Sequence, residues 1–214
     1  MGIYEQSIQR PFTNIKRLLG GILWNILPIL NFVAMGYSLR CAKLSMKNNF
    51  EMPSWDKKGE LFKNGFFSIL IQIIYLLPVI ILFFAMFFSN IVNIIKNLFI
   101  NDKILLGESI ILLIKTNIGL FIFITILGIL ILYITPIAII NFISKNNFNH
   151  AFDLPVIFKK AFTGKYFTTF ILMSLYSILI YILLSFIPFI GGAISGFIIQ
   201  VTSYSAYSAI YNKL

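Results

Sequence analysis

A charged segment, residues 47–64, carries the most distinctive polar cluster in the sequence. It comprises Trp55, Asp56 and Glu60. Carboxylates beside a tryptophan suit a docking or substrate-contact site at a membrane surface. The same pattern is typical of an interfacial helix, in which Ser54 is the N-cap, a carboxylate lies in the first turn and the tryptophan is an anchor. We favour this second interpretation.

Basic side chains near the apolar runs are the next candidates for chemistry. Arg40 ends the first apolar run, and its guanidinium suits bidentate contact with a lipid phosphate or a carboxylate. Long basic side chains at helix ends also extend to the interface without a specific partner, and this is the interpretation that we favour. We predict contacts with the membrane surface or with a partner at Arg40, Trp55, Asp56, Lys57, Lys58, Lys159 and Lys160.

No pattern in the sequence predicts catalysis or a metal site. His150 is the only histidine and has no cysteine or acidic cluster around it. Cys41 lies beside an apolar run, where acylation is one interpretation and a small packing residue is the simpler one. Glu108 follows Gly107 at an expected helix start and suits a capping role. We therefore predict that the protein has no cofactor and is not an enzyme.

The composition indicates an integral membrane protein. Of the 214 residues, 59% are hydrophobic and 11% are charged, and the mean hydropathy is +0.92. A soluble domain has about 45–50% apolar residues. The net charge of +10 then reflects basic loops and an attraction to anionic lipid headgroups rather than nucleic-acid binding.

Five apolar runs predict an all-α polytopic transmembrane bundle. The first run contains Pro28 and Asn31 in its middle. It is therefore either one kinked span or two helices, near 14–28 and 31–46, joined by a turn. The chain accordingly has five or six membrane segments. The runs occupy residues 18–39, 65–88, 116–143, 166–188 and 193–211.

The distribution of basic residues favours the two-helix alternative. It places 14 of the 17 lysines and arginines on one side of the membrane, against 11 with a single span. The positive-inside rule prefers the more uneven distribution and makes loops 40–64 and 144–165 cytoplasmic at the cell membrane. Each loop contains a predicted interfacial amphipathic helix, one beginning at Ser54 and one capped by Asp153. Residues 12–17 are expected at the interface as well.

Short elements recur along the chain. The tetrapeptide KNNF begins at Lys47 and again at Lys145, and residues 26–37 align with 186–197 through a shared proline and glycine. Because the spacing between the elements differs, we predict only a loose internal repeat within one integral membrane domain. The domain is 1–214, the repeat covers about 26–88 and 116–190, and the last helix is 193–211.

Small residues indicate where membrane helices approach closely. The last helix has a GxxxG pattern followed by hydroxyl side chains and a stripe of tyrosines. We expect this helix to be buried in the bundle or at a partner interface. Helix packing is predicted at Gly36, Gly192, Gly196 and Ser203.

Residues from Gly20 to Pro78 contain three segments in a specific order: ILNFVAMGYSLRCAK, MPSWDKKGELFKNGF and IYLLP. This order resembles the domain-of-unknown-function 4013 family of archaeal and bacterial membrane proteins, which carries GY-x-LR, PxWD, LF-x-x-G and IY-x-x-P elements. The resemblance implies a multi-span membrane domain and no particular activity.

Three classes of function are compatible with these patterns. A scaffold or accessory subunit would bind anionic lipid headgroups through the basic loops, or another membrane protein or a second copy through the last helix. A small transporter or channel would use the helices broken at Pro28 and Pro188, although charge is nearly absent from the apolar runs. An intramembrane enzyme is the least favoured class. No nucleic-acid partner is predicted.

Overall fold

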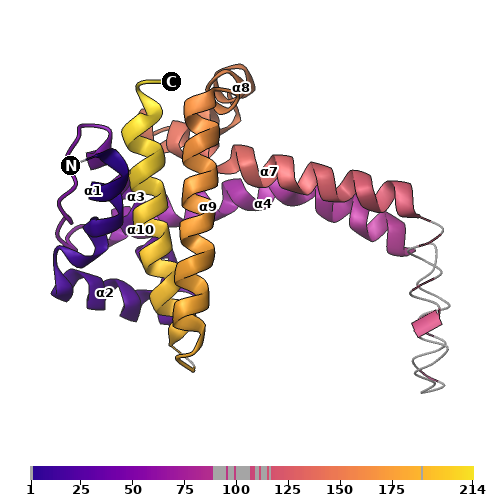
Figure 1. Ribbon diagram of the computed structural model, residues 1–214, viewed down its shortest axis with the longest axis horizontal. Helices are drawn as coiled ribbons and strands as arrows, with labels where there is room; N and C mark the ends of the chain where they lie inside the picture. The colour runs from indigo at the N-terminus through magenta and orange to yellow at the C-terminus, as the bar shows by residue number, and fades with distance from the viewer. Residues whose placement is uncertain are drawn as a thin grey trace. The chain divides into compact units, whose positions relative to one another are not determined.

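The computed structural model describes residues 2–88, 95, 99, 107, 108, 111, 115, 117–188 and 190–214. All regular secondary structure in these residues is helical, which confirms the predicted all-α class (Figure 1). The helices are α1 (Ile3–Gln9), η1 (Arg10–Phe12), α2 (Ile15–Ile26), α3 (Asn31–Ser45), α4 (Lys58–Phe88), α7 (Ile118–Lys145), η2 (Phe148–Phe152), α8 (Leu154–Ala161), α9 (Gly164–Ser185) and α10 (Gly191–Tyr211).

The chain forms two compact units. The larger unit comprises the residues up to Gln72 and from Ile134 onward, and the smaller unit comprises Ile73–Tyr133. Within the smaller unit, α4 and α7 pack through Ile124, which contacts Val79 and Leu82. Most other large apolar side chains described for that unit are exposed, so their covering must come from outside this pair of helices.

Three of the described helices are long and apolar enough to cross a membrane: Lys58–Ala85 within α4, α7 and α9. They contain 28, 28 and 22 residues, and a helix needs about 20 residues to cross a hydrocarbon core of about 30 Å. These helices give the chain the character of a membrane protein. The part of the chain that the structure describes thus has fewer candidate spans than the five or six membrane segments predicted. Helices α2 and α3 have only 12 and 15 residues, and α10 is too rich in serine and glycine.

The first apolar run forms two helices, as one of the two alternatives predicted. Helix α2 ends at Ile26 and α3 begins at Asn31. Leu27 has an extended backbone (φ −94°, ψ 127°), because a residue before proline is disfavoured in the helical region, and Pro28 itself has no N–H for a helical hydrogen bond. The single kinked span is therefore wrong.

The separate helix expected to begin at Ser54 is also wrong. Residues up to Lys57 are not helical, and the helix that follows begins at Lys58 and continues as the first span. Lys57 has a left-handed backbone (φ 51°), which cannot belong to a right-handed helix. The second short helix, α8, is present directly after Asp153 as predicted, although that side chain makes no capping hydrogen bond.

The two KNNF elements have the same local geometry. They end α3 and α7, and the first asparagine of each, Asn48 and Asn146, has a left-handed backbone with φ of 56° and 52°. The amide of the second asparagine, Asn49 or Asn147, bonds to the carbonyl five residues back, which is the Schellman pattern. Its side chain then accepts from the amide two residues on. The sequence repeat is thus a repeated helix C-cap.

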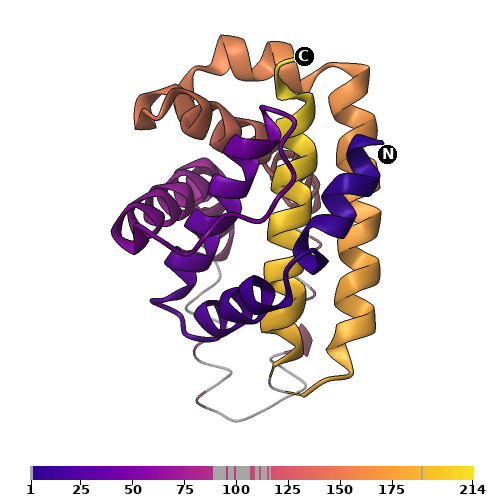
Figure 2. The same cartoon turned by 90° about the vertical axis from the view of Figure 1, so that its left-hand side faces the viewer.

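Helix α10 is the central helix of the larger unit, where it packs against α1, α2, α3 and α9 (Figure 2). At its beginning, Asn25 of α2 donates to the Ala193 carbonyl (2.8 Å). At its end, Asn212 donates to the Met46 carbonyl (3.3 Å) and Lys160 donates to the Tyr211 carbonyl (2.7 Å). Loops 40–64 and 144–165 therefore reach the same end of α10, whereas their side of the membrane remains a prediction.

Helices α3 and α4 cross with their backbones in contact. A Cβ atom at Gly36 would overlap the carbonyl oxygen of Leu61, and one at Gly65 would overlap that of Phe32. Only glycine permits so close an approach from both helices.

We expect Gly36→Ala to lower the free energy of unfolding by about 1–3 kcal/mol, because the new methyl group meets backbone that cannot move aside. Gly59→Ala is the matched control in α4, since a Cβ there meets nothing within 4 Å. It should be neutral or stabilising by up to about 1 kcal/mol. Thermal unfolding in detergent, followed by circular dichroism, measures both. Equal stability of the two variants would contradict the close crossing.

Candidate functional site

The segment Glu51–Asp56 joins α3 to α4 without helical hydrogen bonds, and side chains bind its backbone instead. Four consecutive carbonyl oxygens each accept a hydrogen bond from a long polar side chain. We call this segment the strap. The acceptors and their donors are Glu51 with Arg10 (2.7 Å), Met52 with Arg17, Pro53 with Tyr37 (2.6 Å), and Ser54 with Arg40 (3.2 Å).

Arg10 is the centre of this arrangement. Its side chain is fully buried, and besides the strap it donates to the Cys41 carbonyl (2.8 Å) and to the hydroxyls of Ser45 (2.6 Å) and Ser205 (3.0 Å). These bonds connect η1, α3, α10 and the strap. Its described partners are carbonyl and hydroxyl oxygens, with no carboxylate among them. Burial lowers the pKa of Arg10, because desolvation disfavours the charged form.

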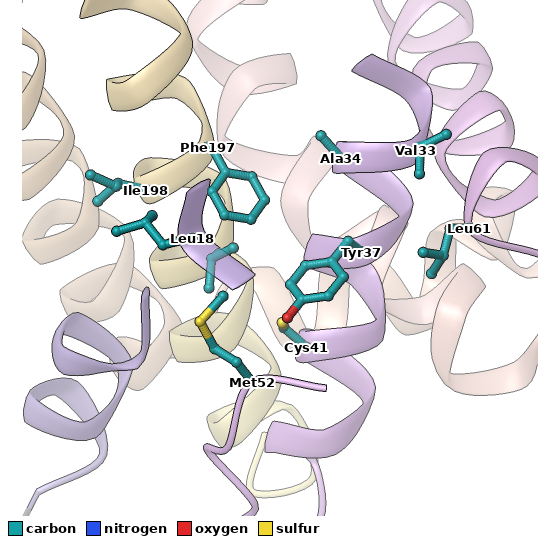
Figure 3. Packing of buried hydrophobic residues seen from close by; sticks show 10 residues of the cluster. Leu18, Val33, Ala34, Tyr37, Cys41, Met52, Leu61, Phe197 and Ile198 are labelled. Atoms are coloured by element: carbon teal, nitrogen blue, oxygen red, sulfur yellow. The ribbon is translucent and has the colours of Figure 1, made fainter. Parts of the chain in front are cut away.

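Trp55 packs into the larger unit. Its ring stacks on Tyr37 with centroids 3.8 Å apart and planes 14° apart, and its Nε1 donates to the Arg17 carbonyl (3.2 Å). Phe197 of α10 lies 6.1 Å from the Trp55 ring and 5.9 Å from the Tyr37 ring, and Figure 3 shows Phe197 and Tyr37. Gly21 of α2 makes room for Phe197, since a Cβ there would overlap the ring. Trp55 thus links the strap to α2, α3 and α10.

Arg40 and Asp56 bind each other. The guanidinium lies 2.7 Å from the Asp56 carboxylate and also donates to its backbone carbonyl (3.0 Å). The Ser54 hydroxyl donates to the same carboxylate oxygen (2.8 Å). The hydrogen bond from Ser54 contributes most to holding the pKa of Asp56 below its usual value, and a backbone hydrogen bond and Arg40 act in the same direction. Because Asp56 is exposed, the pair positions the end of the strap more than it stabilises the fold.

The basic residues predicted as surface contacts differ in their surroundings. Lys57 and Lys159 are exposed. Lys58 lies over the Trp24 ring, 5.3 Å from its centroid. Lys160 is half-buried, lies 4.0 Å from the centroid of the Tyr211 ring and also donates to that residue's carbonyl, so it ties α8 to α10. Burial, together with the neighbouring lysines, lowers its pKa.

The residues predicted for helix packing are also distributed unevenly. Gly36 lies at the crossing with α4, and a Cβ at Gly196 would come within 3.0 Å of the Asn25 amide nitrogen. Gly192 faces open space, so no close approach occurs there within this chain. Ser203 is half-buried on α10.

Sequence reasoning missed Arg10, Arg17 and Tyr37 as a set. One signal was present: the chain has only three arginines among 17 basic residues, and all three bind the strap. A guanidinium offers five donors in a rigid fork, which suits several fixed carbonyl oxygens at once, whereas an ammonium does not. In a lysine-rich chain, the choice of arginine therefore marks positions where geometry matters.

Beside the strap lies a polar pocket of about 470 Å³, lined among others by Gln9, Asn14, Arg17 and Glu51. Within the described ranges, no three histidine, cysteine or acidic side chains come together as metal ligands. Residues 100–106, which precede the helix start expected at Gly107 and Glu108, lie outside the described residues. The polar chemistry that the structure does bring together serves to hold the strap.

We expect Arg10→Met to lower the free energy of unfolding by about 3 kcal/mol or more, because it leaves buried carbonyl and hydroxyl groups without their charged donor. Lys16→Met, which removes an exposed cation nearby, should change it by less than about 0.5 kcal/mol. Denaturant unfolding in mixed micelles compares the two. A small and equal effect of both substitutions would show that the buried guanidinium is dispensable.

Cys41 is fully buried, and burial raises the pKa of its thiol to about 11. The unfolded chain ionises this thiol near pH 8.5. Stability from the neutral folded thiol is therefore complete below about pH 8.5 and is lost as the pH rises towards 11. We expect the unfolding midpoint of the wild type to fall more steeply than that of Cys41→Ala over this range. Parallel curves, or rapid alkylation of the native protein at pH 8, would contradict the burial.

Comparison with known proteins matches the chain to a family model. No characterised protein and no solved structure matches the chain. A family model described as a protein of unknown function, DUF4013, matches residues 19–189. The elements that carry the resemblance meet in space: Tyr37 and Arg40 bind the PxWD element, and Gly36 packs on the LF-x-x-G element. The chain is a member of the DUF4013 family.

Proposed function

We propose that the protein is a non-enzymatic, integral membrane scaffold whose basic end binds anionic lipid headgroups. The basic end is the set of exposed lysines around the C-terminal end of α10. Within the described part of the chain these are Lys43, Lys47, Lys145, Lys159, Lys165 and Lys213. Their gathering at one end of the bundle is the observation that carries the proposal.

Contacts with the end of α10 explain why these lysines gather. Lys43 and Lys47 belong to the end of α3, where the Met46 carbonyl accepts from Asn212. Lys145 ends α7, whose Asn141 accepts from the Tyr211 hydroxyl (2.5 Å). Helices α8 and α9 bring Lys159 and Lys165 through contacts with Tyr211 and Tyr207, and Lys213 follows just after the end of α10. Four segments that are distant in sequence thus contribute to one positive surface.

The chemistry of these side chains fits a lipid surface better than a single small ligand. The arginines are occupied by the strap, and what remains exposed is lysine, a hydrated point charge on a flexible stem. Each lysine near an anionic membrane contributes about 1 kcal/mol, without requiring fixed geometry. By the positive-inside rule, the basic end lies on the cytoplasmic side of the cell membrane.

The experiment compares lipid retention by native mass spectrometry from micelles with equal phosphatidylglycerol and phosphatidylcholine. The wild type should retain phosphatidylglycerol preferentially. In the triple variant Lys47→Gln, Lys159→Gln, Lys213→Gln, the ratio of retained phosphatidylglycerol to phosphatidylcholine should fall at least about tenfold. The reason is that three such contacts contribute about 3 kcal/mol. The matched control neutralises Lys96, Lys103 and Lys115, which the charge distribution assigns to the other side, and should retain the preference.

Two outcomes would contradict the proposal. One is equal retention of both lipids by the wild type. The other is an unchanged preference in the triple variant while its thermal unfolding remains that of the wild type. Ion or solute flux through reconstituted liposomes would instead favour the transporter class.

A further inference from the structure

Helix α2 exposes a continuous apolar row. Ile15, Leu19, Leu23 and Ile26 are 62%, 53%, 66% and 44% exposed. Their spacing of four, four and three residues places them on one face of the helix. Phe12, directly before the helix, is exposed as well. A row of this kind on a folded protein needs an apolar covering.

The opposite side of α2 is fixed to the bundle. Leu18 is buried, Gly21 lies against Phe197, and Gly20 lies against the Trp55 indole. Asn25 bonds to the Ala193 carbonyl. The helix therefore cannot rotate its exposed row inward without breaking the aromatic stack.

The length and direction of α2 exclude a membrane crossing. Its 12 residues extend about 18 Å, far less than the hydrocarbon core. Figures 1 and 2 both show α2 running crosswise to α9 and α10. Helix α9 is long and apolar enough to span, so a helix crosswise to it runs near the membrane plane.

The level of α2 along the bundle matches the end of that span. Ala193, which binds Asn25, is the third residue of α10, just after the turn that follows α9. The turn between a span and the next helix lies near the membrane boundary. Exposed Lys16 flanks the row, and the helix carries no acidic residue, a charge pattern that complements lipid phosphates.

We propose that α2 lies in the membrane interface, with its apolar row inserted among lipid acyl chains and Lys16 at the phosphate level. The occupant of this surface is lipid. This surface is separate from the basic end, so the inference does not depend on the lysines that surround the end of α10.

Spin labels on single cysteines test the inference in liposomes. Labels at Leu19→Cys and Leu23→Cys are compared with labels at Leu175→Cys, on the exposed face of α9, and at Lys57→Cys, in the aqueous loop. Buried Cys41 is replaced by alanine in all of them. Frequent collisions of a label with oxygen indicate that the label lies in lipid, and frequent collisions with a water-soluble nickel complex indicate that it lies in water.

We expect both α2 labels to collide with oxygen at least about threefold more than the Lys57 label does, at a depth about 5–10 Å below the phosphates. The α9 label should lie deeper. Nickel accessibility equal to that at Lys57 would overturn the inference, because the row would then face water. Dipolar broadening between α2 labels of two copies would overturn it too, because a second copy would then cover the row.

Discussion

The structure depends on the capture of backbone carbonyls by buried arginines. A connection without secondary structure leaves its carbonyl oxygens unpaired, and each unpaired group costs free energy when it is buried. In the strap, consecutive carbonyls from Glu51 to Ser54 are paired by Arg10, Arg17, Tyr37 and Arg40. Next to these carbonyls Trp55 stacks on Tyr37, and α4 begins at Lys58 and crosses α3 at Gly65.

The division between arginine and lysine organises the larger unit. Arg10 is buried and Arg17 and Arg40 are half-buried where fixed oxygens converge, whereas exposed lysines surround the end of α10. Both side chains carry one positive charge, but they differ in geometry and hydration, so arginine suits fixed carbonyl oxygens and lysine suits a hydrated surface. The interior cations hold one conformation, and the exterior cations remain free to meet lipid. The diffuse positive charge at the end of α10 is the feature on which the proposed scaffold role rests.

Local patterns predicted local structure well. Pro28 broke the first run and Asp153 preceded α8, because each depends on a few neighbouring residues. The misses came from contacts between distant residues. The contacts of Trp55 with Tyr37 and Phe197, for example, join three distant segments, and no local pattern indicates them. Likewise the sequence of α10 predicts a membrane span, whereas in the structure its hydroxyl and tyrosine side chains are buried in the centre of the bundle.

Limited trypsin digestion tests the central claim most directly. Lys47 and Lys57 flank the strap, and Lys57 is exposed and outside any helix. If side chains lock the strap, cleavage after these lysines should proceed only as fast as the bundle opens, and Arg10→Met should accelerate it. Rapid cleavage of the native protein after Lys57, while circular dichroism shows the helices intact, would show that the strap is a free loop.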